Sequence, residues 1–182
     1  MVLDQYRSLE QFAIDEGAHK AKVIRSEDIV IDDRVRLKCQ VPVCQYFNRH
    51  LLCPPHTLSV AEFRSLCSQY PAALLVQAAS QGFEENSLLE AEKKLHLLVN
   101  KVEGRALSEG HYLASGFIAS SCKLCAQCVG YNSKEPCRRP YEARPSIEAM
   151  GVDIFKTSQN AEIGFSLGLS SEVVFSGLIL LD

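Results

Sequence analysis

The chain has 182 residues, of which 47% are hydrophobic, and a formal net charge of −3. This size and composition suit one domain with its own core, so we interpret residues 1–182 as a single domain. The slight acidity excludes the global basic field of many nucleic-acid-binding proteins. The longest apolar runs, such as Ala72–Val76 and Leu178–Leu181, are too short to span a bilayer. We expect no nucleic-acid partner, no membrane insertion and, since no signal peptide is visible, a cytoplasmic location.

Hydrophobic periodicity predicts helices and strands that alternate along the chain. Helices are predicted at 8–16, between Ser59 and Pro71, and at 86–109, with short helical pieces at 146–150 and 153–162. Extended segments are predicted at 19–25, 29–38, 72–79, 111–119 and 172–181. Each of the first three helices is expected to begin with a capping box, at Ser8 and Gln11, Ser59 and Glu62, and Ser87 and Glu90.

The segments 72–80, 86–109 and 111–119 read as strand, long helix and strand, which is the pattern of a βαβ unit. The expected fold class is therefore α/β or α+β. We expect a small mixed sheet with a βαβ crossover and with cysteine-rich metal-binding loops, at 39–55 and 122–139, gathered at one end.

The eight cysteines are bunched in two groups, which in a reducing compartment favours metal or redox chemistry over disulfides. The second group has three cysteines separated by two residues each, and a fourth nine positions further on: Cys122, Cys125, Cys128 and Cys137. Thiolates at this spacing are typical ligands of an iron–sulfur cluster, although the gap to the fourth is longer than in bacterial ferredoxins. Zinc is the main alternative, but zinc sites usually use two separated ligand pairs. The group predicts a [4Fe–4S] cluster, with Cys137 as the local fourth ligand.

The first group comprises Cys39, Cys44 and Cys53, and Cys53 is followed by two prolines. Proline after a ligating cysteine also occurs in ferredoxins. Three interpretations stay open: Cys67 completes a second cluster, a cysteine of the other group crosses over, or one iron keeps an open position for a small ligand. The further alternative is a zinc site, or a group of cysteines with a purely structural role.

Other residues near the two groups have weaker signals. Cys67 lies on the apolar face of its predicted helix, so we interpret it as a core residue. His50 and His56 flank Cys53, where they would ligate or hydrogen-bond a cluster, or else be exposed loop residues. Arg138 and Arg139, together with Arg144, follow Cys137. Cationic groups there would stabilise a reduced cluster or dock an acidic electron-transfer partner, unless they form a solvated basic loop.

The chain resembles a prokaryotic domain-of-unknown-function family of predicted metal-binding proteins. The resemblance rests on the Cys39, Cys44 and Cys53 segment, on the cysteine triplet that begins at Cys122, and on the run CRRPYEARPSIEAMGVDIF from Cys137. It implies metal binding and a prokaryotic, often anaerobic, setting, and it supplies no reaction. Because a cysteine at position 67 is not a regular feature of that family, the resemblance also disfavours Cys67 as a ligand.

Three functions fit these patterns. The first is an iron–sulfur protein that carries electrons to a redox partner protein, with one or two [4Fe–4S] clusters. The second is an enzyme, or an accessory protein that handles metals or clusters, with an open coordination site in the first group. The third is a zinc-stabilised interaction module. The sequence has no Walker A loop, no G-x-G-x-x-G and no H-E-x-x-H to indicate a nucleotide site or a zinc protease.

Overall fold

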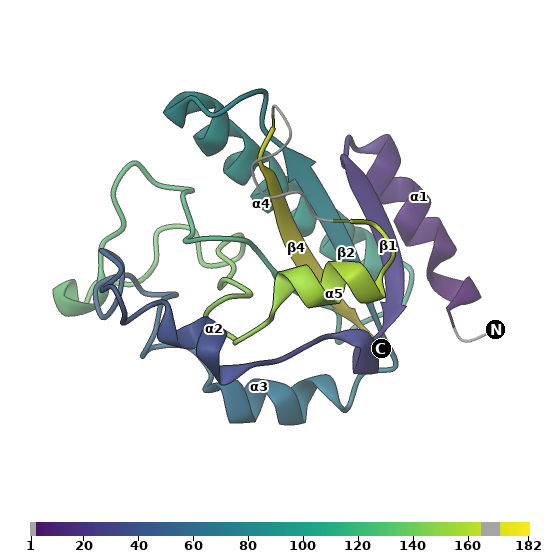
Figure 1. Ribbon diagram of the computed structural model, residues 1–182, viewed down its shortest axis with the longest axis horizontal. Helices are drawn as coiled ribbons and strands as arrows, with labels where there is room; N and C mark the ends of the chain where they lie inside the picture. Colours follow the sequence, from purple (N-terminus) through teal and green to yellow (C-terminus); the bar gives the residue numbers. More distant parts are fainter. Residues whose placement is uncertain (1–2, 165–171) are drawn as a thin grey trace.

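The computed structural model describes residues 3–164 and 172–182. Four strands form one sheet in the order β1-β2-β4-β3, and every neighbouring pair is antiparallel (Figure 1). The strands are β1 (Lys20–Arg25), β2 (Ala72–Ala79), β3 (Ser115–Phe117) and β4 (Val174–Leu181). The two central strands pair along their whole length, with Leu74 opposite Ile179. They are the most buried elements of the described chain because both faces of the sheet are covered.

The strands β2 and β3 are joined by the long helix α4 (Glu85–Ser108), as the sequence predicts. Both strands are antiparallel to β4, so they run parallel to each other. However, β4 lies between them, and no parallel strands of the described sheet are hydrogen-bonded neighbours. The α+β class is therefore confirmed. The strand β4, which follows β3 in the chain, separates the two strands of the crossover. Local sequence patterns do not reveal this arrangement.

Helices cover the two faces of the sheet (Figure 1). On one face α1 (Arg7–Asp15) and α4 pack against inward side chains such as Leu74 and Val76 of β2. On the other face α3 (Val60–Cys67) and α5 (Ile154–Asn160) pack against Ala73 and Leu75 of the same strand. Successive residues of a strand point to opposite faces, so one apolar strand supplies both clusters.

Only one of the three expected capping boxes forms. At the start of α3 the amide of Glu62 donates to Ser59 Oγ at 3.2 Å, and the Ser59 amide donates to the Glu62 carboxylate at 2.7 Å. Ser8 instead donates to Glu109, and Ser87 accepts a hydrogen bond from the amide of Gln81. These two serines lie inside their helices and serve tertiary contacts, which a capping pattern cannot distinguish from a cap.

The segment 29–38 was predicted to be extended, and the structure corrects this. It contains the short helix α2 (Asp33–Leu37), whose first turn is capped by Asp32 through a 2.9 Å hydrogen bond from the Arg34 amide. Arg36 reaches the carbonyls of Leu58 and Ala149. The alternation of basic and apolar residues here therefore reflects separate tertiary contacts and an exposed Leu37, not the two faces of a strand.

Other boundaries differ less. Of the predicted strand 111–119, only β3 forms a strand. His111 and Leu113 make hydrogen bonds with Asp182 instead of with a neighbouring strand. The helical piece predicted at 146–150 is a turn, and α5 fills most of the piece predicted at 153–162. Three short 3₁₀ helices complete the described elements: η1 (Asp4–Tyr6), η2 (Ser26–Asp28) and η3 (Tyr131–Ser133).

Candidate metal centre

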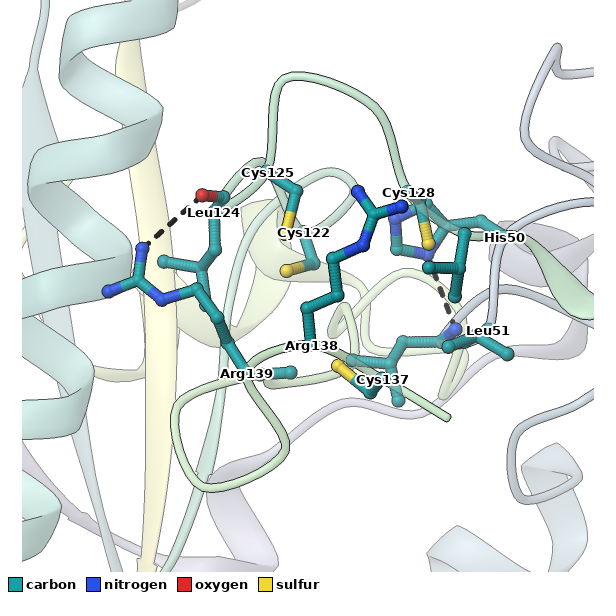
Figure 2. Close-up of a pocket in the computed structure, with 12 residues that line it drawn as sticks. His50, Leu51, Cys122, Leu124, Cys125, Cys128, Cys137, Arg138 and Arg139 are labelled. Atoms are coloured by element: carbon teal, nitrogen blue, oxygen red, sulfur yellow. Dashed lines mark hydrogen bonds between the residues drawn. The ribbon is translucent and has the colours of Figure 1, made fainter. Parts of the chain in front are cut away.

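The four cysteines of the second group lie around one pocket (Figure 2). Cys122 packs partly against the core cluster under α4, so the sheet fixes its position. The loop that starts there returns to the same place, because the amide of Ile118 donates to Pro145 and its carbonyl accepts from Ile147, at 3.0 and 2.8 Å. Cys125, Cys128 and Cys137 belong to the loop that this base closes.

The electrostatics of this pocket favour a cationic occupant. Burial raises the pKa of the Cys122 thiol, and the neighbouring thiols of Cys137, Cys125 and Cys128 raise it further. The Leu124 amide donates a hydrogen bond to the Cys122 sulfur and lowers its pKa. Four thiolates that line one pocket repel one another unless a metal core balances their charge. The donor set therefore fits soft metals and iron–sulfur clusters.

Both arginines predicted at the site line the pocket (Figure 2). Arg139 donates to the Leu124 carbonyl at 3.3 Å and pairs with Glu142, and its guanidinium is within electrostatic range of the thiols of Cys125 and Cys122. Arg138 is exposed and makes a long contact of 3.5 Å with the Gln127 carbonyl. Its side chain extends into the space between the cysteines, where the open volume is about 30 Å³. A cluster in this pocket therefore requires Arg138 to turn outward, which its exposure permits.

Arg144 has a different role from the other two arginines. Its guanidinium forms a largely buried ion pair with Glu103 of α4, at 2.6 Å. It therefore ties the segment after the pocket to the helix, and it does not line the pocket.

The first group also comes together. The Cys44 amide donates to the Cys39 carbonyl at 3.1 Å, and the Cys53 side chain is buried. Burial raises the pKa of Cys53 to about 12, with smaller contributions from the thiols of Cys44, Cys39, Cys128 and Cys122. Cys53 is thus within electrostatic range of thiols from both groups. The two groups are adjacent parts of one region and not two separate surfaces.

Contacts between the two loops hold them side by side. The Tyr131 amide donates to the Arg49 carbonyl at 2.8 Å. The rings of His56 and Tyr131 are stacked, with centroids 3.3 Å apart and planes inclined by 12°. His56 Nε2 also contacts Asn48 Oδ1 at 3.0 Å. His56, one of the histidines that flank Cys53, therefore joins the two loops through its contacts with Tyr131 and Asn48.

His50 is buried, which differs from the interpretation of this residue as an exposed loop histidine. Its Nδ1 accepts a hydrogen bond from the Leu52 amide at 3.3 Å, and its ring also interacts with the backbone of Cys122. Burial lowers its pKa, which favours the neutral ring. His50 thus links the first loop to the start of the second one and lines the cysteine pocket as a positioning residue.

Sequence reasoning missed a polar array behind Cys122. Ser120 adopts a left-handed conformation with φ of +61°, and its amide donates to the Glu148 carboxylate at 3.1 Å. Its hydroxyl accepts from Lys123, which also pairs with Glu92 at 2.6 Å. Burial raises the pKa of Glu148, which is in electrostatic contact with Cys39. In the sequence, Ser120 and Lys123 stand close to the cysteine triplet, but a serine and a lysine at these positions do not by themselves indicate a polar array.

Cys67 lies away from both groups. It is buried in the cluster between the sheet and α3, beside residues such as Phe63 and Ile24. Burial alone raises its pKa to about 12, with no contribution from another thiol. The structure therefore places Cys67 in the core.

Within residues 3–164 and 172–182, no three His, Cys, Asp or Glu side chains are close enough together to hold a single metal ion.

The profile of one protein family, DUF2284, described as predicted metal-binding proteins, matches residues 22–181. The chain belongs to this family. Membership in DUF2284 supports metal binding in general, and both cysteine loops lie within the matched residues. Searches of curated proteins and of solved structures gave no significant match. None of the helices in the described part of the chain combines the length and apolar character that a membrane span requires.

Proposed function

We propose that Cys122, Cys125, Cys128 and Cys137 hold a [4Fe–4S] cluster and that the protein carries electrons, alone or as a redox subunit. The observation that carries the proposal is the pocket lined by these four cysteines, with the spacing of an iron–sulfur motif. Membership in a family of predicted metal-binding proteins supports the general class of site.

The residues around the pocket suit the charge of such a cluster. When bound, the cluster supplies one-electron transfer. Arg138 and Arg139 would oppose the added negative charge of the reduced form, and the Leu124 amide would hydrogen-bond a ligating sulfur, both of which raise the reduction potential. The exposed Arg138 would also offer a contact to an acidic redox partner protein.

A second centre at Cys39, Cys44 and Cys53 belongs to the same proposal. Its support is the electrostatic interaction of Cys53 with Cys39 and Cys44 of its own group, and also with Cys128 and Cys122 of the second group. A centre at each group would place two redox sites next to each other, which suits a carrier that passes electrons through the molecule.

An alternative function, an enzyme or a metal or cluster accessory protein, is favoured by one observation. Cys67 lies in the core, so only three thiols of the first half of the chain gather at the first group. A cluster with three cysteine ligands keeps one iron open to a small ligand. Addition of cyanide to the reduced protein tests this alternative, since a changed electron paramagnetic resonance spectrum would support it.

The deciding experiment is anaerobic purification followed by analysis of iron, acid-labile sulfide and zinc. The proposal predicts about four iron atoms and matching sulfide per chain for one cluster, or about eight for two. Stoichiometric zinc without sulfide would overturn it and support the zinc-stabilised interaction module.

A further inference from the structure

A cleft of about 1130 Å³ opens between the first half of α4 and the two cysteine loops. The thiol-bearing residues Cys122, Cys125 and Cys128 form part of its wall, and so does His50. Small-molecule sites in proteins are hollows of roughly 300–1000 Å³ with an apolar lining and a few placed polar groups. The cleft is slightly larger than that range, and it leads directly to the candidate metal centre.

One wall of the cleft is apolar. The adjacent Leu88 and Leu89 line it near the start of α4, Leu97 lines it about two turns further along, and Phe175 of β4 adds an aromatic ring. Leu97 is 50% exposed, although it lies in the middle of a helix that otherwise covers the sheet. A leucine left open in a concave site contributes binding energy to an apolar ligand without any rearrangement of the core.

The polar groups of the cleft are predominantly cationic. Arg49, Lys93, Lys123 and Arg139 line it, with Glu85 and Glu92 as the acids. Lys123 is already paired with Glu92, and Arg139 with Glu142. In contrast, the side chains of Arg49 and Lys93 make no hydrogen bond or ion pair with the described part of the chain. Two unpaired cations beside an apolar wall fit a ligand with one anionic group and an apolar body.

We propose that this cleft binds a small organic anion, with its apolar body on the leucines of α4 and its carboxylate or phosphate on Arg49 and Lys93. The bound molecule would then lie next to the cysteines of the second group. Its role as a reactant of that centre rests on the proposed function, whereas the binding itself rests on the cleft alone. The hollow shape favours a small molecule over the flat contact of a partner protein.

The test uses benzoate and phenyl phosphate as probes, with benzyl alcohol as the neutral probe of similar shape. Binding is measured by calorimetry on the full chain purified anaerobically, with its iron content determined in parallel. Both anions are expected to bind at least tenfold more tightly than the alcohol, and the tighter of the two identifies the anionic group. The double variant Arg49→Gln with Lys93→Gln should weaken anion binding about tenfold, because it removes two charged partners.

Two further variants make the test specific. Lys94→Gln is the matched control, because Lys94 is an exposed neighbour on α4 whose ammonium lies beside Gly17 and outside the cleft. It should leave the Kd unchanged. Leu97→Ser should weaken all three probes, since it removes apolar contact from the wall. Because Arg49, Lys93 and Leu97 are all exposed, none of these changes opens a cavity in the core.

Three results would overturn the inference: no binding of either anion, equal binding of the alcohol, or equal loss of binding in Lys94→Gln. The iron analysis keeps this inference separate from the proposed function. Iron and sulfide without anion binding removes the cleft proposal alone. Anion binding that depends on Arg49 and Lys93 in a protein without iron supports the ligand site and overturns the redox proposal.

Discussion

The sheet with its helices and the two cysteine loops are stabilised in different ways. Seven of the eight residues of β2 are buried, and both faces of that strand contact apolar clusters. Between Cys122 and Pro145, by contrast, no residue is fully buried and the one regular element is η3. The loops are joined by single polar and ring contacts, such as those of His50 with the Cys122 backbone and of His56 with Tyr131.

This difference indicates which part of the molecule depends on metal. Burial of apolar surface stabilises the sheet region independently of any cofactor. The second cysteine loop buries too little apolar surface to offset the entropy of ordering it, so in our proposal the metal–thiolate bonds supply that free energy. The following predictions test this comparison, from the largest expected effect to the smallest.

The variant Cys125→Ala should lose the centre of the second group entirely. Because metal binding would order this loop, residues 120–145 should become sensitive to protease while the sheet region stays folded. Iron and sulfide analysis with limited proteolysis measures both effects. Cys137→Ala should behave in the same way, since Cys137 lines the same pocket.

The control for this prediction is Ala126→Ser, a change at an exposed neighbour in the same loop. It should keep full iron and protease resistance. A Cys125→Ala protein that retains its full iron and sulfide would show that the second group is not the metal site.

The variant Leu95→Ala should produce the opposite pattern. Leu95 is fully buried between α4 and the sheet, so its truncation should lower the free energy of unfolding by about 2–5 kcal/mol. Iron per folded chain should stay constant, because the loops do not contain this residue. Denaturant unfolding and iron analysis test the two parts, with the half-exposed Leu97→Ala as a control of much smaller cost.

The variant His50→Ala should affect the connection between the regions. It leaves the Leu52 amide and the Cys122 backbone without their partner, which should cost about 1–3 kcal/mol. Because Cys122 is then less firmly placed, the reduction potential or the spectrum of the centre should also change. A purely structural role would alter stability alone. His19→Gln, at an exposed histidine before β1, should change neither property.

The variant Cys67→Ala should have the smallest effect. It removes one buried sulfur from the cluster under α3, so we expect a loss of about 1 kcal/mol and unchanged iron. Cys67→Ser should cost more, because it places a hydroxyl in an apolar site, and should also keep its iron. Loss of iron from both variants would identify Cys67 as a ligand instead of a core residue.

Local sequence patterns determined much of this protein because the forces behind them act over a few residues. The apolar run of β2 gave the correct strand bounds, and Ser59 with Glu62 marked the start of α3 through a real capping box. The cysteine triplet could be read as a metal motif because two-residue gaps bring thiolates to one face of a loop. Its ligand role stays a prediction until metal analysis.

Only the tertiary structure decided the rest, because it depends on contacts between residues distant in the chain. The insertion of β4 between β2 and β3 follows from pairing that no local pattern encodes. The helix α2, which Asp32 caps locally, replaces a predicted strand, and its Arg36 bonds to the Ala149 carbonyl far along the chain. The burial of His50 and the electrostatic contact of Cys53 with thiols of both groups likewise arise from the packing of two loops some 80 residues apart in sequence. Spacing along the chain can suggest ligands, but only folding determines which of them meet.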